Sequence, residues 1–349
     1  MAPPPTDSQF DLFGDPIRPP GGRPARGHDR AGIGAAVPDE SLVALGERLP
    51  GRLYLGTSSW SFPGWTGLVY DRAGDASRLS REGLVAYGRH PLLRSVGIDR
   101  SFYAPLTAAQ YARHAAQVPE TFRFLVKAPA ACTSIVLRGE GGPAVANEGF
   151  LDERIALEQF VWPALEGLGA RAGPLVFQFS PLGRAWTRVP QRFADALHGF
   201  LAAVRAGAPE ALLAVEVRDP EVLVEPFFQV LAGCAVRYCI GVHARMPAVQ
   251  AQAARAAIIG PGPLVVRWNL HSGFGYEEAK ARYEPFDRLV DEDPEARQAL
   301  ARLAVSTLAG GQPAWIIANN KAEGSAPLTL RRLAEAVRDL TSGPGPAPA

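Results

Sequence analysis

Cysteine, lysine and long apolar runs are scarce in this chain, and its net charge is close to zero. The three cysteines (Cys132, Cys234 and Cys239) are an odd number without metal-ligand spacing, which is typical of a reduced, cytoplasmic protein. No run reaches the roughly 18 apolar residues that a membrane span needs. The net charge of +1 predicts no bulk attraction to nucleic acid or to a membrane surface. We therefore expect a cytoplasmic protein without a membrane partner.

Only three of the 36 basic residues are lysine: Lys127, Lys280 and Lys321. The other basic residues are arginine, which stays charged when buried, whereas the pKa of a buried lysine falls. Two of the lysines, Lys127 and Lys321, lie at the ends of predicted strands. Chance and a functional requirement for an amine are both open explanations for those positions.

Eight short runs rich in β-branched and aromatic residues recur between Leu53 and Ala318, separated by helix-length segments. They are LYLGT, SVGID, FRFLVK, LVFQF, LLAVEV, VRYCIG, LVVRW and AWIIA. This alternation predicts an α/β fold, a TIM-like (β/α)8 barrel over residues 51–340. A doubly wound dinucleotide-binding sheet is disfavoured because GTSSWSFPGW follows the first strand in place of a GxGxxG turn. The Pro/Gly/Arg-rich residues 1–50 and the tail 341–349 are predicted to be disordered.

Amphipathic spacing predicts helices between the strands. They are expected over residues 79–89, 107–117, 148–168, 190–205, 220–232 and 325–340. In the third of these, the Trp162-Pro163 step predicts a bend or a break, because proline removes a helix hydrogen bond. The stretch 275–308 is longer than one helix and is interrupted at Pro285 and Pro294, so a lid or a substrate-specific insertion is expected there.

Polar side chains at the carboxyl ends of the strands mark the expected site, since barrel enzymes carry their chemistry at that face. Glu216 and Arg218 alternate on one strand and therefore point the same way. Glu216 is a candidate general acid or base and Arg218 a candidate holder of an anionic oxygen, with a structural ion pair as the alternative. Lys127 is the third catalytic candidate, through a Schiff base, phosphate binding or an ion pair.

Further residues near the same ends are candidates for binding the ligand: Asp99, Arg267, His243, Asn319 and Asn320, with the aromatic residues Trp60 and Tyr103. Adjacent amides, a cation and a helix start after the last strand favour a phosphate or another anion. The aromatic residues are equally compatible with stacking on a base or sugar and with closing the barrel rim. The cofactor is unknown, and no metal site is predicted because only His243 and His271 lie near the expected mouth.

The segments GTSSWSFPGW, IDRSFYAP, FRFLVKAPA, FQFSP, AVEVRDP and ANNKAEGSAPLTLRRL resemble, in this order and spacing, the YecE-like family, also called domain of unknown function 72. The resemblance extends over about residues 53–340. It implies a TIM-barrel-like fold and no established reaction. Five candidate positions match the family pattern: Lys127, Glu216, Arg218, Asn319 and Asn320.

Two motifs depart from the family pattern. The motif that resembles V-E-x-N-x-x-F-Y reads VGIDRSFY here, so Gly97 stands in place of a carboxylate residue and Asp99 in place of an amide. A motif that resembles I-T-H after the third strand reads Cys132-Thr133-Ser134, without the histidine. If relatives share a mechanism that uses those groups, the activity of this chain is expected to be altered or absent.

The segment Gln9-Phe10-Asp11-Leu12-Phe13 resembles the short peptide by which bacterial DNA-metabolism proteins bind the replication sliding clamp. In that interpretation Leu12 and Phe13 fill an apolar pocket, and Gln9 supplies a hydrogen bond. Phe10 replaces the usual leucine. A disordered arm would keep the peptide accessible. The alternatives are that the segment packs onto the barrel or that the match is accidental.

Two functional hypotheses follow. The first is an enzyme that binds an anionic, phosphate-bearing or nucleotide-like ligand, or a nucleic-acid fragment, at the carboxyl end of the barrel. It would be a hydrolase or lyase linked to DNA metabolism. The second is a non-catalytic binding module that its N-terminal peptide recruits to the sliding clamp.

Overall fold

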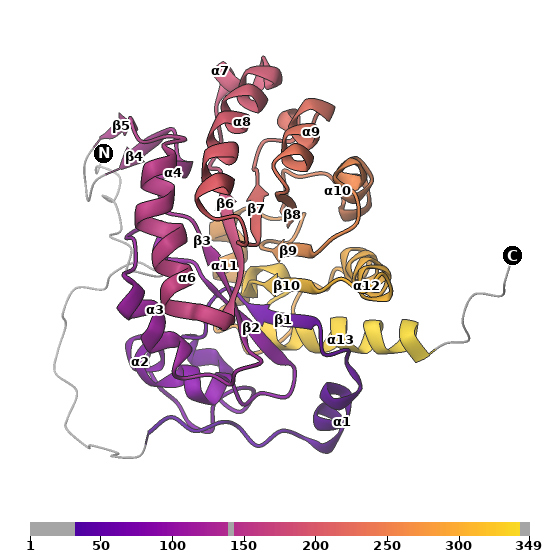
Figure 1. Ribbon diagram of the computed structural model, residues 1–349. Coiled ribbons are helices and arrows are strands. Elements are labelled where there is room, and N and C mark those ends of the chain that lie inside the picture. The colour runs from indigo at the N-terminus through magenta and orange to yellow at the C-terminus, as the bar shows by residue number, and fades with distance from the viewer. Residues whose placement is uncertain (1–31, 139–142, 343–349) are drawn as a thin grey trace, which may run out of the picture.

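The computed structural model describes residues 32–138 and 143–342, and its centre is a closed barrel of parallel strands (Figure 1). The strands are β1 (Leu53–Thr57), β2 (Leu93–Ile98), β3 (Arg123–Lys127), β6 (Ala172–Gln178), β7 (Leu213–Glu216), β8 (Arg237–Val242), β9 (Leu264–Trp268) and β10 (Ala314–Ala318). β1 pairs with both β10 and β2, which closes the ring. Each of the eight predicted runs contributes one strand, so the predicted TIM-like fold is confirmed.

Helices surround the barrel and connect successive strands. The longer ones are α1 (Glu40–Arg48), α2 (Ala76–Tyr87), α3 (Ala108–Ala115), α6 (Trp162–Leu168), α8 (Pro190–Gly207), α9 (Glu225–Gly233), α10 (Val249–Ala256), α11 (Tyr276–Tyr283), α12 (Pro294–Ala309) and α13 (Ala326–Ser342). Three are single turns: α4 (Ala130–Thr133), α5 (Glu153–Ala156) and α7 (Arg184–Thr187). Strands β4 (Val136–Arg138) and β5 (Ala144–Ala146) pair antiparallel outside the barrel. In the described ranges, no helix combines the length and apolarity needed to cross a membrane.

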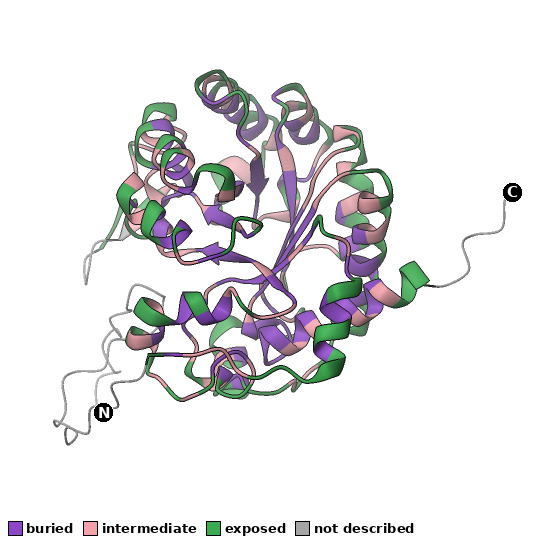
Figure 2. Cartoon of the chain, turned by 60° about the horizontal axis from the view of Figure 1, so that its bottom comes forward, coloured by how far each residue is buried: buried purple, intermediate pink, exposed green. Residues whose placement is uncertain are grey.

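The helices are held to the barrel by one apolar face each. In α8, the buried residues Phe193, Leu197, Leu201 and Val204 recur at three- and four-residue spacing. That spacing places them on one side of an α-helix, against the strands. Each fully buried side chain of this kind contributes about 1.5–3 kcal/mol to folding. Figure 2 shows the result, with buried strands at the centre and helices whose outward faces are exposed.

The helix predicted over residues 148–168 is interrupted as the Trp162-Pro163 step predicts. α5 passes into a π-helical turn at Leu157–Val161, and α6 begins at Trp162 with the proline in its first turn. Proline has no N–H to donate and its ring crowds the preceding turn, so a widened turn relieves the clash while the chain continues in the same direction.

The N-terminal boundary of the fold differs from the prediction. Residues 40–48, predicted to be part of a disordered arm over 1–50, form α1 instead. Asp39 caps this helix by accepting a hydrogen bond from the Leu42 N–H at 2.8 Å, and Leu42 and Leu45 are buried where α1 contacts α13. The prediction was therefore wrong for this stretch. At the other end, α13 runs through Ser342, past the predicted start of the tail.

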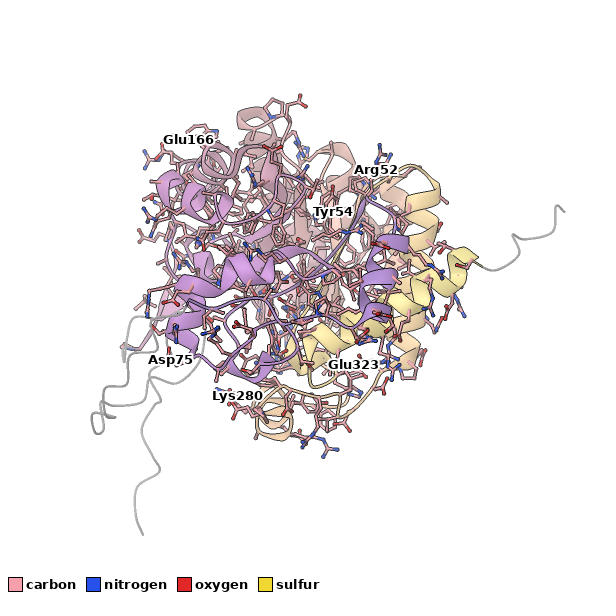
Figure 3. The ribbon with its side chains drawn as sticks, turned by 90° about the horizontal axis from the view of Figure 1, so that it is seen from below. Arg52, Tyr54, Asp75, Glu166, Lys280 and Glu323 are labelled. Atoms are coloured by element: carbon pink, nitrogen blue, oxygen red, sulfur yellow. The ribbon has the colours of Figure 1, made fainter. Side chains whose placement is uncertain are left out.

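Figure 3 separates the two ends of the barrel. Arg52 and Tyr54, at the start of β1, lie in the upper half of this view. Asp75, Lys280 and Glu323 come from segments that follow the carboxyl ends of β1, β9 and β10, and they lie in the lower half. The carboxyl ends of the strands, where the site is expected, therefore open toward that lower side.

Candidate functional site at the barrel mouth

Strand alternation turns polar side chains into the barrel near its carboxyl end. The layer below is apolar and consists of Leu125, Val176, Ala214, Cys239, Val265 and Ile317. Two residues further along the same strands are Lys127, Gln178, Glu216, Gly241, Arg267 and Asn319. The floor of the site is thus a mainly polar layer that rests on an apolar one.

Glu216 is fully buried in this layer. Its Oε1 lies 2.8 Å from Arg218 Nη2, its Oε2 lies 2.8 Å from Arg267 Nη1, and Asn269 Nδ2 donates to Oε1 at 3.2 Å. Gly241 leaves room for the carboxylate, because a Cβ there would lie 3.3 Å from Oε1. Burial alone raises the pKa of this carboxyl, but the two guanidinium charges outweigh it, and the pKa lies below the ordinary value. Glu216 is therefore an ionised carboxylate that fixes two arginines.

Arg267 links the centre of the layer to Asp99. Its Nη2 donates to Asp99 Oδ2 at 2.6 Å and its Nη1 donates to Gln178 Oε1 at 3.1 Å. The buried atoms without a hydrogen-bond partner in the described part of the chain include Asp99 Oδ1 and Arg218 Nη1, as well as Arg267 Nε. Asp99 and Arg218 line the cavity at the barrel mouth, so these two residues offer a ligand an acceptor and a cationic donor.

Lys127 differs from Arg267, the other cation of this layer, because no carboxylate in the described residues forms an ion pair with it. Its Nζ lies 3.6 Å from the centre of the Phe102 ring, and no ion pair is formed within residues 32–138 and 143–342. Burial lowers the pKa of the Lys127 ammonium to about 7; Asp99 opposes this shift, and Arg267 and Arg218 reinforce it. The amine therefore changes its protonation state near neutral pH.

His243 also lines the cavity, as expected, but as a neutral ring. The Arg245 N–H donates to its Nδ1 at 3.3 Å. Burial, reinforced by the charge of Arg218, lowers the pKa of His243 to about 4. Its Nε2 therefore carries the proton and is a hydrogen-bond donor at neutral pH.

The two adjacent asparagines at the end of β10 have different environments. Asn319 lines the cavity, where its Nδ2 donates to Ser58 Oγ at 2.9 Å. Asn320 points away from the cavity and is buried, and its Oδ1 accepts hydrogen bonds from Trp65 Nε1 at 3.2 Å and from the Ala326 N–H at 2.8 Å. Asn320 therefore does not line this cavity, and its role in binding a ligand stays a prediction. It supports the aromatic loop after β1 and the start of α13.

Aromatic side chains form the walls of the cavity. Trp60 is buried, and its indole N–H donates to Ser80 O at 3.2 Å, so it is a fixed wall. Tyr103 is 60% exposed and stands at the rim. Tyr276 and Phe286 reach the cavity from the excursion between β9 and α12, where an insertion was expected.

The cavity has a volume of about 210 Å³ and a positive lining. Its charged lining residues are Asp99, Arg100, Lys127, Arg218, Arg267 and Lys321. Only one of these is an acid, and the buried Glu216 adds a second carboxylate within the floor layer. The excess of cations in a partly enclosed site concentrates the potential and favours an anionic ligand.

Three residues that line the cavity were not predicted from the sequence: Gln178, Arg100 and Tyr276. Gln178 had a usable signal, because it follows the inward Val176 by two residues on β6. Arg100 lies in a 3₁₀ turn and Tyr276 at the start of α11, where the two-residue period of a strand does not apply.

The candidate clamp-binding residues Gln9, Phe10, Leu12 and Phe13 lie outside the residues that the structure describes. No group of three or more His, Cys, Asp or Glu side chains suited to a metal ion is found among the residues the structure describes.

Comparisons with known proteins agree with the barrel. A family model described as a protein of unknown function, DUF72, matches residues 54–349. A DUF72 family protein from Enterococcus faecalis has a similar structure at 16% identity and a TM-score of 0.55, with 82% of this chain and 95% of that chain covered. A DUF72 family protein from Thermotoga maritima matches at 18% identity and a TM-score of 0.52, with 83% and 99% covered.

No curated protein matches this sequence. At identities this low, the two structures establish a shared fold and carry no information on the reaction. The family model is decisive for membership, because it spans every strand of the barrel and the polar layer at its mouth. The chain belongs to the DUF72 family, the one its sequence motifs resemble.

Proposed function

We propose that this protein is an enzyme that binds an anionic, phosphate-bearing or nucleotide-like small molecule at the barrel mouth and acts on it with Lys127. One observation carries the proposal. Lys127 and Arg218 line the same cavity; in the described part of the chain, no carboxylate pairs with Lys127, and Arg218 Nη1 has no hydrogen-bond partner. A buried cationic donor such as Arg218 Nη1 is normally satisfied, and an anionic oxygen would satisfy it and also pair with the half-buried Lys127.

The contacts of Glu216 favour a positioning role for it, in place of the general acid or base role expected from the sequence. A general base must be able to accept a proton near the working pH, whereas two arginines hold Glu216 in the ionised form. Its role in the proposal is to position Arg218 and Arg267. Lys127, with a pKa of about 7, takes the role of acid, base or nucleophile. A hydrolase or a lyase fits this set of groups.

Anion binding is testable by thermal unfolding. Inorganic phosphate, glycerol phosphate or a nucleoside monophosphate is expected to raise the Tm of the wild-type chain, because a ligand of the native state stabilises it. Lys127→Met is expected to weaken binding by about tenfold to a hundredfold, which corresponds to the roughly 1.5–3 kcal/mol of a charged hydrogen bond.

Lys280→Met is the matched control, since Lys280 lies on α11 and does not line the cavity. It should retain the full shift in Tm. Chloride at the same ionic strength controls for screening. Equal shifts in the wild type and Lys127→Met, or no shift with any of the phosphates, would reject the proposal.

The second candidate function, a non-catalytic module recruited to the sliding clamp, depends on the sequence of Gln9–Phe13 alone. A peptide of residues 1–20 is expected to bind a bacterial sliding clamp with micromolar affinity, measured by fluorescence polarisation, if Leu12 and Phe13 fill an apolar pocket. Leu12→Ala/Phe13→Ala should abolish that binding. Equal binding of both peptides, or of neither, would remove the link to DNA metabolism.

A further inference from the structure

Lys127 differs from the neighbouring arginines of the cavity in the group that its charged end contacts. Arg218 and Arg267 each have a carboxylate oxygen at 2.8 Å or closer. Lys127 Nζ rests on the face of Phe102 at 3.6 Å, and no carboxylate in the described residues pairs with it. An ammonium held by an aromatic ring loses less energy on giving up its proton than one held by a carboxylate. The geometry therefore leaves a primary amine available inside an anion-binding cavity.

We infer that Lys127 forms an imine with the aldehyde or ketone group of an anionic substrate, whose phosphate or carboxylate is held by Arg218 and Lys321. This inference rests on the proposed function, because it assigns a substrate class to the same cavity. It places the reaction among those that break or form a bond at the carbon next to a carbonyl.

The use of lysine at this position supports the inference. Only three of the 36 basic residues in the chain are lysine. An arginine would satisfy simple phosphate binding and would match the rest of the sequence, but a guanidinium does not form an imine. A requirement for an amine explains why position 127 departs from the arginine usage of the chain.

The electrostatic surroundings keep part of the amine neutral. Burial lowers the pKa of Lys127 to about 7; the charges of Asp99 and Glu216 raise it, and those of Arg267 and Arg218 lower it. A pKa in this range makes the neutral amine accessible at neutral pH. The neutral form, with its free electron pair, is the form that attacks a carbonyl carbon.

The chemistry balances without an oxidant or a reductant. The amine adds to the carbonyl carbon, a C–N bond forms as the C=O π bond breaks, and one proton moves from nitrogen to oxygen. The nitrogen electron pair then forms C=N, the C–O bond breaks, and the hydroxyl leaves as water after taking one proton from solvent. The product is a protonated imine. Its positive nitrogen accepts the electron pair of a bond broken at the adjacent carbon.

Reductive trapping tests the inference on the full chain. The protein is incubated with dihydroxyacetone phosphate, glyceraldehyde 3-phosphate, pyruvate or glyoxylate and then with borohydride, which converts an imine into a stable amine. Peptide mass spectrometry should find one adduct on Lys127, at least tenfold above Lys280 and Lys321. The yield should rise as the pH increases through about 7, because the neutral amine is required.

Glycerol phosphate, which has no carbonyl, should protect Lys127 by occupying the anion site. Lys127→Arg keeps the charge and should lose the adduct, whereas Lys280→Arg should keep it, and the Tm of each variant shows that it is folded. Labelling of Lys127 no greater than that of Lys280 with all four probes would overturn the inference. If phosphate still raises the Tm in that case, anion binding stands and only the imine is rejected; if it does not, both fail.

Discussion

Glu216→Gln is expected to lower the free energy of unfolding by about 3–5 kcal/mol, the usual cost of removing one charge from a buried ion pair. The carboxylate is fully buried and lies 2.8 Å from both Arg218 and Arg267. The neutral amide keeps the shape but leaves Arg218 without its buried counterion. Urea unfolding of the two proteins measures the difference.

Glu82→Gln is the matched control, because Glu82 pairs with Arg78 at 3.1 Å on the surface, with 41% of its side chain exposed. Its loss should not exceed about 1 kcal/mol. Adding Arg218→Met to Glu216→Gln should recover part of the stability, since it removes the charge left unpaired. Losses of the same size in the two single variants would show that the buried carboxylate does not hold the layer together.

The pH dependence of stability has a defined sign. The folded-state pKa of Glu216 is depressed, so its contribution is fully present above the unfolded-state pKa of about 4.3 and is lost as the pH falls through the folded-state value. The wild-type chain should therefore lose stability more steeply than Glu216→Gln as the pH falls below about 4. Parallel acid unfolding curves would contradict this account.

Strand periodicity explains why most of the site was predictable from the sequence. Lys127, Glu216 and Arg267 each follow an inward apolar residue by two positions, so they must also point inward. The rule does not extend to Asn320, because β10 ends at Ala318 and Asn320 begins a 3₁₀ turn. Its position just after a strand was therefore not enough to place Asn320 in the cavity lining.

The contacts within the polar layer join residues that are far apart in the sequence, so a local sequence pattern does not predict them. Arg267 on β9 reaches Asp99 after β2, and two strands lie between them in the barrel. Which cation is left without a carboxylate follows from this register, so the isolation of Lys127 was not predictable. Helix α1 was not predicted because it is short. Its nine residues contain only two buried leucines, and this pattern cannot be distinguished from that of a linker.

Gly97→Glu is expected to abolish most anion binding. Gly97 lines the cavity at the position where the family pattern resembles V-E-x-N and carries a carboxylate. A Cβ at this glycine would lie 3.1 Å from Ser58 O, so the neighbouring backbone needs to shift by only a few tenths of an ångström to accept a side chain. The new carboxylate would enter the cavity beside Asp99 and compete with the ligand for Lys127.

A like charge in a partly enclosed site costs a bound anion at least about 1.4 kcal/mol, so phosphate affinity measured by the shift in Tm should fall at least tenfold in Gly97→Glu. Gly97→Gln adds nearly the same volume without the charge and should retain binding to within a few-fold. Equal losses of phosphate affinity in the two variants would mean that the added volume at Gly97, and not the charge, prevents binding. A loss confined to Gly97→Glu would show that the lack of a carboxylate at Gly97 lets this chain bind an anion at the barrel mouth.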